Sequence, residues 1–158
     1  MRPFIVFAFL LALPLHADEL PGHSAHGEAF NEGPRQAAVL IPGCGDAVKF
    51  PISTKKPEAQ QFFTQGVGQL HGFWYYEAER SFRQVAALDP DCAMAYWGMA
   101  MSNVNTEKRA KAFTEKAVKL KDKANAREKQ WIGMLETLYK DDKRDKKQRS
   151  LDCIRDLE

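Results

Sequence analysis

The sequence lacks the motifs that mark several common enzyme classes. Its 158 residues contain three cysteines and neither a Cys-x-x-Cys nor a Cys-x-x-Cys-His motif, which argues against a thioredoxin-like redox site and covalently attached haem. A glycine-rich phosphate loop, a nucleophile elbow and a His-Glu-x-x-His motif are missing as well. Acidic residues such as Glu77 and Glu79 are expected on a solvated helix face. We therefore expect no catalysis and no cofactor.

A long hydrophobic run is also missing. The apolar stretch over residues 4–13 has about half of the ~20 residues that a membrane-spanning helix needs. Arg2 precedes this stretch, Pro14 follows it, and the small Ala17 stands before an acidic residue, which is typical of a secretory signal peptide. We interpret residues 1–17 as a signal peptide and expect a periplasmic or secreted protein with no stable membrane span after its removal. The alternative is an anchor that stays attached.

Charge of one sign is not in excess, because the formal net charge is +2. The distribution is uneven: residues 106–149 carry 15 basic and 8 acidic side chains. Such a bias can mark a surface that binds nucleic acid or membrane. In an exported protein, lysines on the wet faces of helices explain it better, so we expect no nucleic-acid partner.

The three cysteines, Cys44, Cys92 and Cys153, form an odd set. In an exported protein this leaves a free thiol or a bridge to another chain. Cys44 and Cys92 could form a disulfide, and equally Cys92 and Cys153 could be small buried apolar residues. The sequence leaves the pairing open.

Residues 18–56 form an irregular leader that is rich in glycine, proline and polar residues. No sustained helical period appears in it, although the stretch AVKFPI could form a short extended piece. We expect the leader to be partly disordered or to lie on the following domain. It contains His23, His26 and Glu28, and imidazole and carboxylate groups are good ligands for zinc or copper. A periplasmic metal-binding protein is therefore an alternative function.

Helical periodicity begins at Pro57, which suits the first turn of a helix. The apolar pattern predicts helices within residues 57–73, 75–90, 92–103, 107–121, 127–139 and 141–158. Gly72 and Pro90 are expected to end the first two helices. Asp91 is expected to cap the third helix, and Asn125 to open a capping box.

Aromatic residues recur along these helices at a nearly constant interval. Phe62, Tyr96 and Trp131 lie 34 and 35 residues apart, which is the period of a helical repeat. The first unit reads Phe62-x2-Gln65-Gly66, Ala78-x3-Phe82 and Pro90. This pattern resembles the tetratricopeptide repeat (TPR) signature of an aromatic, a Leu-Gly pair, a further aromatic, Ala-x3-Phe and Pro.

The later units keep part of this pattern. Ala100 takes the place of Gly66 in the second unit, whereas Leu135 stands where the third unit would need a small residue. The stretches GHSAHGEAFNEGPRQ and LHGFWYYEAERSF are similar to segments of exported bacterial TPR proteins of unassigned function.

The resemblance implies an all-α fold: a TPR-type right-handed superhelix of antiparallel helix hairpins, with about three pairs over residues 57–158. Small Gly66 and Ala78 would let two helices cross closely, and Phe82 would fill the space toward the next hairpin. An ordinary helical bundle is the alternative. Because the chain stops inside the last helix, we expect either truncation of a longer protein, such as an enzyme, or self-association through that uncapped helix.

The resemblance also implies a concave groove lined by the first helix of each pair. By position, the groove residues are Phe63, Val67, Leu70, His71, Met94, Trp97 and Met101. Such an aromatic and methionine-rich surface suits an apolar peptide or helix. We predict a scaffold that binds another protein or peptide and is not an enzyme. In the alternative, the leader or a later repeat covers these residues and they belong to the core.

Overall fold

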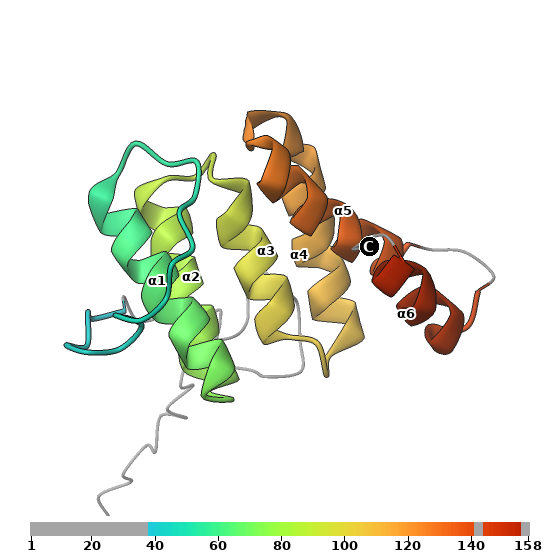
Figure 1. Cartoon of the computed structure of the whole chain (residues 1–158), viewed down its shortest axis with the longest axis horizontal. Coiled ribbons are helices and arrows are strands. Elements are labelled where there is room, and N and C mark those ends of the chain that lie inside the picture. The colour runs from blue at the N-terminus through green and yellow to red at the C-terminus, as the bar shows by residue number, and fades with distance from the viewer. Residues whose placement is uncertain (1–37, 141–143, 156–158) are drawn as a thin grey trace, which may run out of the picture.

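The structure is a computed structural model that describes residues 38–140 and 144–155 (Figure 1). Within these residues all regular secondary structure is helical, so the expected all-α class is confirmed. The elements are α1 (Pro57–His71), α2 (Tyr75–Leu88), α3 (Ala93–Ser102), α4 (Glu107–Lys119), the short 3-10 helix η1 (Lys121–Lys123), α5 (Ala126–Tyr139) and α6 (Lys146–Arg155). The predicted signal peptide lies outside the described residues. None of the described helices is long and apolar enough to cross a membrane.

Successive helices pair as hairpins that stack side by side. α1 packs on α2, α3 on α4, and α5 on α6, and the joints between hairpins bring α2 against α3 and α4 against α5 (Figure 1). α1 also contacts α3, and α3 contacts α5. The odd-numbered helices therefore share one face, and neighbouring hairpins bury apolar side chains against one another, as in helical-repeat proteins.

The ends of α1 and the start of α5 follow the local sequence signals. Pro57 occupies the first turn of α1, and Gly72 caps its C-terminus, with its N–H donating to the carbonyl of Gly68 at 3.0 Å. The capping box of α5 is confirmed, because Asn125 Oδ1 accepts from the Glu128 N–H at 3.0 Å and Glu128 Oε2 accepts from the Asn125 N–H at 3.1 Å.

The predicted cap of α3 is wrong. Cys92, not Asp91, is the N-cap residue, and its side chain makes no capping hydrogen bond. Asp91 instead pairs with Lys123 of η1, at 2.8 Å between Oδ2 and Nζ. The Asp91 carboxylate therefore forms an ion pair with η1 instead of capping the helix that follows it.

The first joint closes around the ring of Phe82, which is fully buried. A Cβ atom added to Gly66 would lie 2.7 Å from this ring, and one added to Gly98 would lie 2.3 Å from it. The two glycines thus give the ring its space, one on α1 and one on α3. Other repeat positions named from the sequence, Phe62, Ala78, Tyr96 and Ala100, are also buried. Pro90 lies in the turn between α2 and α3.

The last helix leaves an apolar side uncovered among the described residues. Leu151 and Ile154 of α6 are 49% and 56% exposed. The predicted start of this helix near residue 141 is several residues too early, since α6 begins at Lys146. Self-association through this surface stays a prediction.

Candidate functional site

Three aromatic side chains stand next to one another on the odd-numbered helices. Phe63 of α1, Trp97 of α3 and Trp131 of α5 each follow the previous one by 34 residues. The ring centroids lie 6.2 Å apart for Phe63–Trp97 and 5.8 Å apart for Trp97–Trp131. Such distances are those of favourable aromatic pairs. We call the face that these rings line the concave face, after the groove that the TPR resemblance implies.

This arrangement corrects the alignment of the third unit. The 35-residue interval paired Trp131 with Tyr96, but the structure brings Trp131 to Trp97. Tyr96 lies elsewhere, with its hydroxyl donating to the carbonyl of Pro90 at 3.3 Å. In α5 the fully buried apolar positions are instead Ile132 and Leu135.

The concave face is not open. Residues 48–54, which we call the strap, run across it before α1 begins (Figure 1). The ring of Phe50 enters the aromatic row, with centroids 5.3 Å from Phe63, 5.7 Å from Trp97 and 5.9 Å from Trp131. Arg127 covers the ring from outside, with its guanidinium carbon 4.8 Å from the ring centroid. A single side chain of the strap thus touches all three hairpins.

Gln60 of α1 holds the backbone of the strap at two points. Its Oε1 accepts from the Ile52 N–H at 2.8 Å, and its Nε2 donates to the Phe50 carbonyl at 3.0 Å. An amide side chain can satisfy a donor and an acceptor of one extended segment in this way. Gln60 thus binds backbone atoms of the strap, and the strap side chains remain available for packing against other residues.

The first turn of α5 holds the next part of the strap. Arg127 donates to the Pro51 carbonyl, and Glu128 Oε1 accepts from the Ser53 N–H. Glu128 is 1% exposed and also serves the capping box, so one carboxylate fixes both a helix start and the strap. Its negative charge is favoured at the N-terminus of a helix.

The preceding residues are also bound to α1. Gln65 Oε1 accepts from the Ile41 N–H at 2.7 Å, and its Nε2 donates to the Val39 carbonyl at 3.1 Å. Gly45 adopts φ +86°, and a Cβ at Gly68 would lie 2.9 Å from its Cα. The leader therefore lies on the domain from residue 38 onward.

The residues predicted to line the groove differ in their exposure to solvent. Four of the seven predicted groove side chains are buried: Phe63, Val67, Met94 and Trp97. Leu70 and Met101 are partly buried and His71 is exposed. This burial matches the alternative in which these residues belong to the core, and Phe50 of the strap packs against two of them, Phe63 and Trp97. Partner binding by the seven residues stays a prediction. The Nε1 atom of Trp97 is buried and finds no hydrogen-bond partner among the described residues.

A buried ion pair links the first two hairpins on the other side of the stack. Arg109 is 1% exposed, and its Nη2 lies 2.6 Å from Oε1 of Glu79. Asn103 joins them, donating to Glu79 Oε2 and accepting from Arg109 Nε, each at 2.8 Å. The expectation that Glu79 lies on a solvated face is wrong, because the second helix of the next hairpin covers it. A similar pair of lower burial, Arg149 with Glu107, joins α6 to α4 at 2.9 Å.

The turn between α1 and α2, together with the first turn of α2, presents aromatic residues to solvent. Phe73, Trp74 and Tyr76 are 76%, 62% and 43% exposed. Phe73 has φ 61°, a left-handed conformation that is unfavourable for a bulky residue. Their exposure was not predicted, because composition and periodicity alone do not distinguish a solvent-facing aromatic at a turn from a buried one.

The described residues show neither a disulfide nor a metal cluster. Cys44, Cys92 and Cys153 form no disulfide with one another, and burial raises the pKa of Cys92 to about 11, which keeps its thiol protonated at neutral pH. No group of three His, Cys, Asp or Glu residues in the part of the chain described by the structure could hold a metal ion. His23, His26 and Glu28 lie outside that part, so metal binding by the leader stays a prediction.

Comparison of the chain with protein-family models, curated proteins and solved structures finds no match. The candidate site therefore rests on its own geometry: an aromatic face that holds an extended segment through side-chain contacts to its backbone.

Proposed function

We propose that the chain is an exported TPR-type scaffold that binds another protein through an extended segment on the concave face. The repeat signature and the shared face of α1, α3 and α5 support a TPR-type superhelix. The apolar stretch near the N-terminus supports a periplasmic or secreted location. Neither catalysis nor a cofactor is part of this proposal.

The observation that carries the proposal is the way in which the strap is held. Backbone groups inside a helix are already paired with one another, so a helical surface can bind the backbone of an extended segment only with side chains. Gln60, Arg127 and Glu128 do this for consecutive strap residues, while the aromatic row receives one ring. The concave face thus has the contacts that peptide recognition requires, and the strap occupies them in cis.

A partner segment must replace the strap to use this face. A tethered segment competes at an effective concentration on the order of millimolar. We therefore expect the intact chain to bind weakly to a short peptide that only reproduces the strap, and a chain with a weakened strap to bind it more tightly.

The test uses the full chain carrying Phe50→Ala and a fluorescein-labelled peptide with the sequence of residues 46–55, DAVKFPISTK. Fluorescence polarisation should show saturable binding, and the intact chain should bind at least about tenfold more weakly because of its tethered strap. Adding Gln60→Ala to the Phe50→Ala chain should reduce binding, since it removes two backbone contacts. Absence of saturable binding to the folded Phe50→Ala chain would contradict the proposal.

A further inference from the structure

The strap also indicates which class of partner segment the concave face selects, an inference that rests on the proposed function. We infer that the face binds an extended segment with the pattern aromatic–Pro–aliphatic, running in the same direction as the strap. The aromatic residue takes the place of Phe50 and the aliphatic residue takes the place of Ile52. The ligand is thus a protein partner with such a segment, identified by these three positions.

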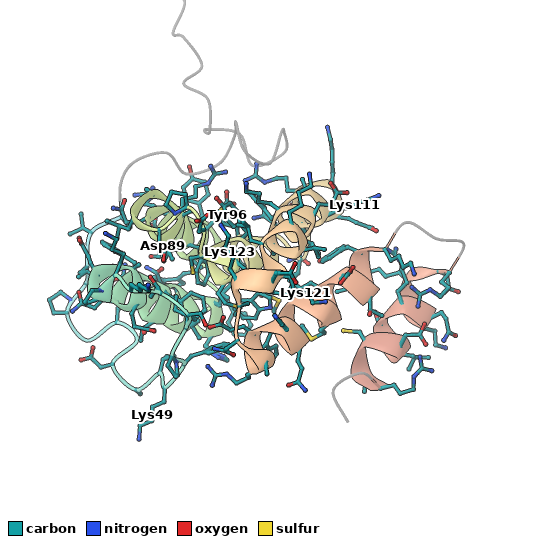
Figure 2. All side chains as sticks on the ribbon, turned by 90° about the horizontal axis from the view of Figure 1, so that it is seen from above. Lys49, Asp89, Tyr96, Lys111, Lys121 and Lys123 are labelled. Carbon is teal, nitrogen blue, oxygen red and sulfur yellow. The ribbon has the colours of Figure 1, made fainter. Side chains whose placement is uncertain are left out.

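Side-chain burial along the strap alternates as in an extended chain. Ile52 is 8% exposed and Phe50 is partly buried, whereas Lys49, Pro51 and Ser53 are exposed. Lys49 points away from the body of the molecule in Figure 2. Therefore only every second side chain of the strap contacts the concave face, and only these positions can determine which segment binds.

The pocket for the first position favours an aromatic ring. Phe50 meets Phe63 and Trp97 edge to face, with interplanar angles of 86° and 69°, and Arg127 lies over its ring. Edge-to-face packing and a cation above the ring depend on the quadrupole of an aromatic group. An aliphatic side chain of similar size would fill the space without these interactions.

The backbone contacts explain why proline fits the middle position and why direction matters. Phe50 and Pro51 use their carbonyls, while Ile52 and Ser53 use their N–H groups, so no contact requires an N–H at position 51. Proline favours the extended conformation and loses little entropy on binding. A segment in the opposite direction would not present the carbonyl and N–H to Gln60 in this order.

A natural partner must also displace the tethered strap. It therefore needs more contacts with the protein than the strap itself makes. A cavity of about 620 Å³ adjoins the C-terminal end of the strap and is lined by Ser53, Thr54, Lys55, Lys56 and, across from them, charged residues of the turns at 89–91 and 123. Because Ser53 and Thr54 belong to the strap, a longer partner segment that replaces it would lie in their place and face the charged side chains of Asp89, Asp91 and Lys123.

The experiment titrates the Phe50→Ala chain with variants of the DAVKFPISTK peptide. Replacing the peptide phenylalanine by alanine should weaken binding at least about tenfold, and replacing it by leucine should weaken it several-fold. The matched control replaces the outward lysine by alanine and should change binding by less than about twofold. A peptide with the reversed sequence should bind at least about tenfold more weakly.

The outcomes separate this inference from the proposed function. Equal binding of the alanine, leucine and reversed peptides would overturn the selectivity but leave peptide binding in place. Failure of every peptide to bind would overturn the proposed function itself. If circular dichroism shows that the Phe50→Ala chain has lost its helical signal, the Ile52→Ala chain is titrated instead. It should give the same ranking of peptides, and a different ranking would overturn the inference.

Discussion

Two groups of aromatic residues in this chain have similar composition and different environments. Phe50, Phe63, Trp97 and Trp131 meet on the concave face, whereas Phe73, Trp74 and Tyr76 stand exposed at the turn between α1 and α2 and the start of α2. The first group is spread over about 80 residues of sequence, and the second lies within four. Burial therefore comes from the 34-residue interval and the strap, which bring distant rings together, and not from local aromatic density.

The energetic consequence is that the two groups contribute differently to stability. On the concave face Phe63 and Trp97 are buried and Phe50 and Trp131 are partly buried, and each ring contacts others, so each stabilises the stack of hairpins. Rings on the turn gain little burial, and Phe73 adds the strain of a left-handed backbone. The predictions below test this difference, beginning with the largest expected effect.

The largest effect is expected for Trp97→Ala, which removes a side chain that is 4% exposed. The free energy of unfolding should fall by about 3–5 kcal/mol, the range for truncating a buried tryptophan. Urea denaturation followed by circular dichroism measures it. Trp74→Ala is the matched control and should change stability by less than about 0.5 kcal/mol. Equal losses for the two tryptophans would contradict the comparison.

The next largest effect is on the pH dependence of the free energy of unfolding, and it comes from the Cys92 thiol at the start of α3. Burial raises its pKa from 9.0 to about 11, so the folded state keeps the thiol protonated where the unfolded state ionises it. The stabilisation is fully present below about pH 9 and is lost as the pH rises toward 11, by roughly 2–3 kcal/mol.

Cys92→Ala should remove this part of the alkaline loss, so the difference in unfolding free energy between pH 8.5 and 11 should become smaller. Cys44→Ala, at a partly exposed thiol, should leave it unchanged. A pH dependence that is identical in both variants would show that Cys92 is not the responsible group.

A smaller loss is expected for Phe50→Ala, because the Phe50 ring is only partly buried. The free energy of unfolding should fall by about 1–2 kcal/mol, below the value for full burial of a phenylalanine. Tryptophan emission should also shift to longer wavelength, since Trp97 and Trp131 lose their cover. Lys49→Ala, a change to an outward-facing strap residue, should alter neither quantity. An unchanged emission spectrum for Phe50→Ala would indicate that the ring does not cover the tryptophans.

The smallest effect should have the opposite sign. Phe73→Gly places glycine at φ 61°, where it is not strained, and removes a side chain that is 76% exposed. Relief of strain and the greater freedom of unfolded glycine partly offset each other, so a gain of up to about 1 kcal/mol is expected. Thermal unfolding checks it, and a loss above about 1 kcal/mol would mean that the Phe73 side chain contributes packing.

Local sequence signals predicted much of this fold. The helices, the proline and glycine at helix ends and the capping box depend on contacts within one or two turns, which a sequence displays directly. The alignment of the third unit failed for a specific reason. The first two units each have two adjacent aromatics, Phe62–Phe63 and Tyr96–Trp97, whereas the third has Trp131 without an aromatic neighbour. The interval alone could align Trp131 with Phe62 and Tyr96 or with Phe63 and Trp97.

The contacts that were missed join residues far apart in the sequence. Glu79 and Arg109 lie 30 residues apart, and Ser53 lies 75 residues from Glu128, so no local pattern reveals either contact. The strap did carry one signal. Val48, Phe50 and Ile52 alternate with polar or outward residues, which is the period of an extended segment with one buried side. That pattern indicated an extended piece but not the surface that would receive it.

The most direct test of the account is the position of the Phe50 ring in solution. Nuclear Overhauser effects measured by NMR report proton pairs that lie within about 5 Å, close to the ring separations found here. The account predicts cross-peaks from the Phe50 ring to Phe63 and to the indoles of both Trp97 and Trp131. Sharp Phe50 signals, typical of a solvent-exposed ring, without any of these cross-peaks would contradict the account, because the concave face would then not hold the strap.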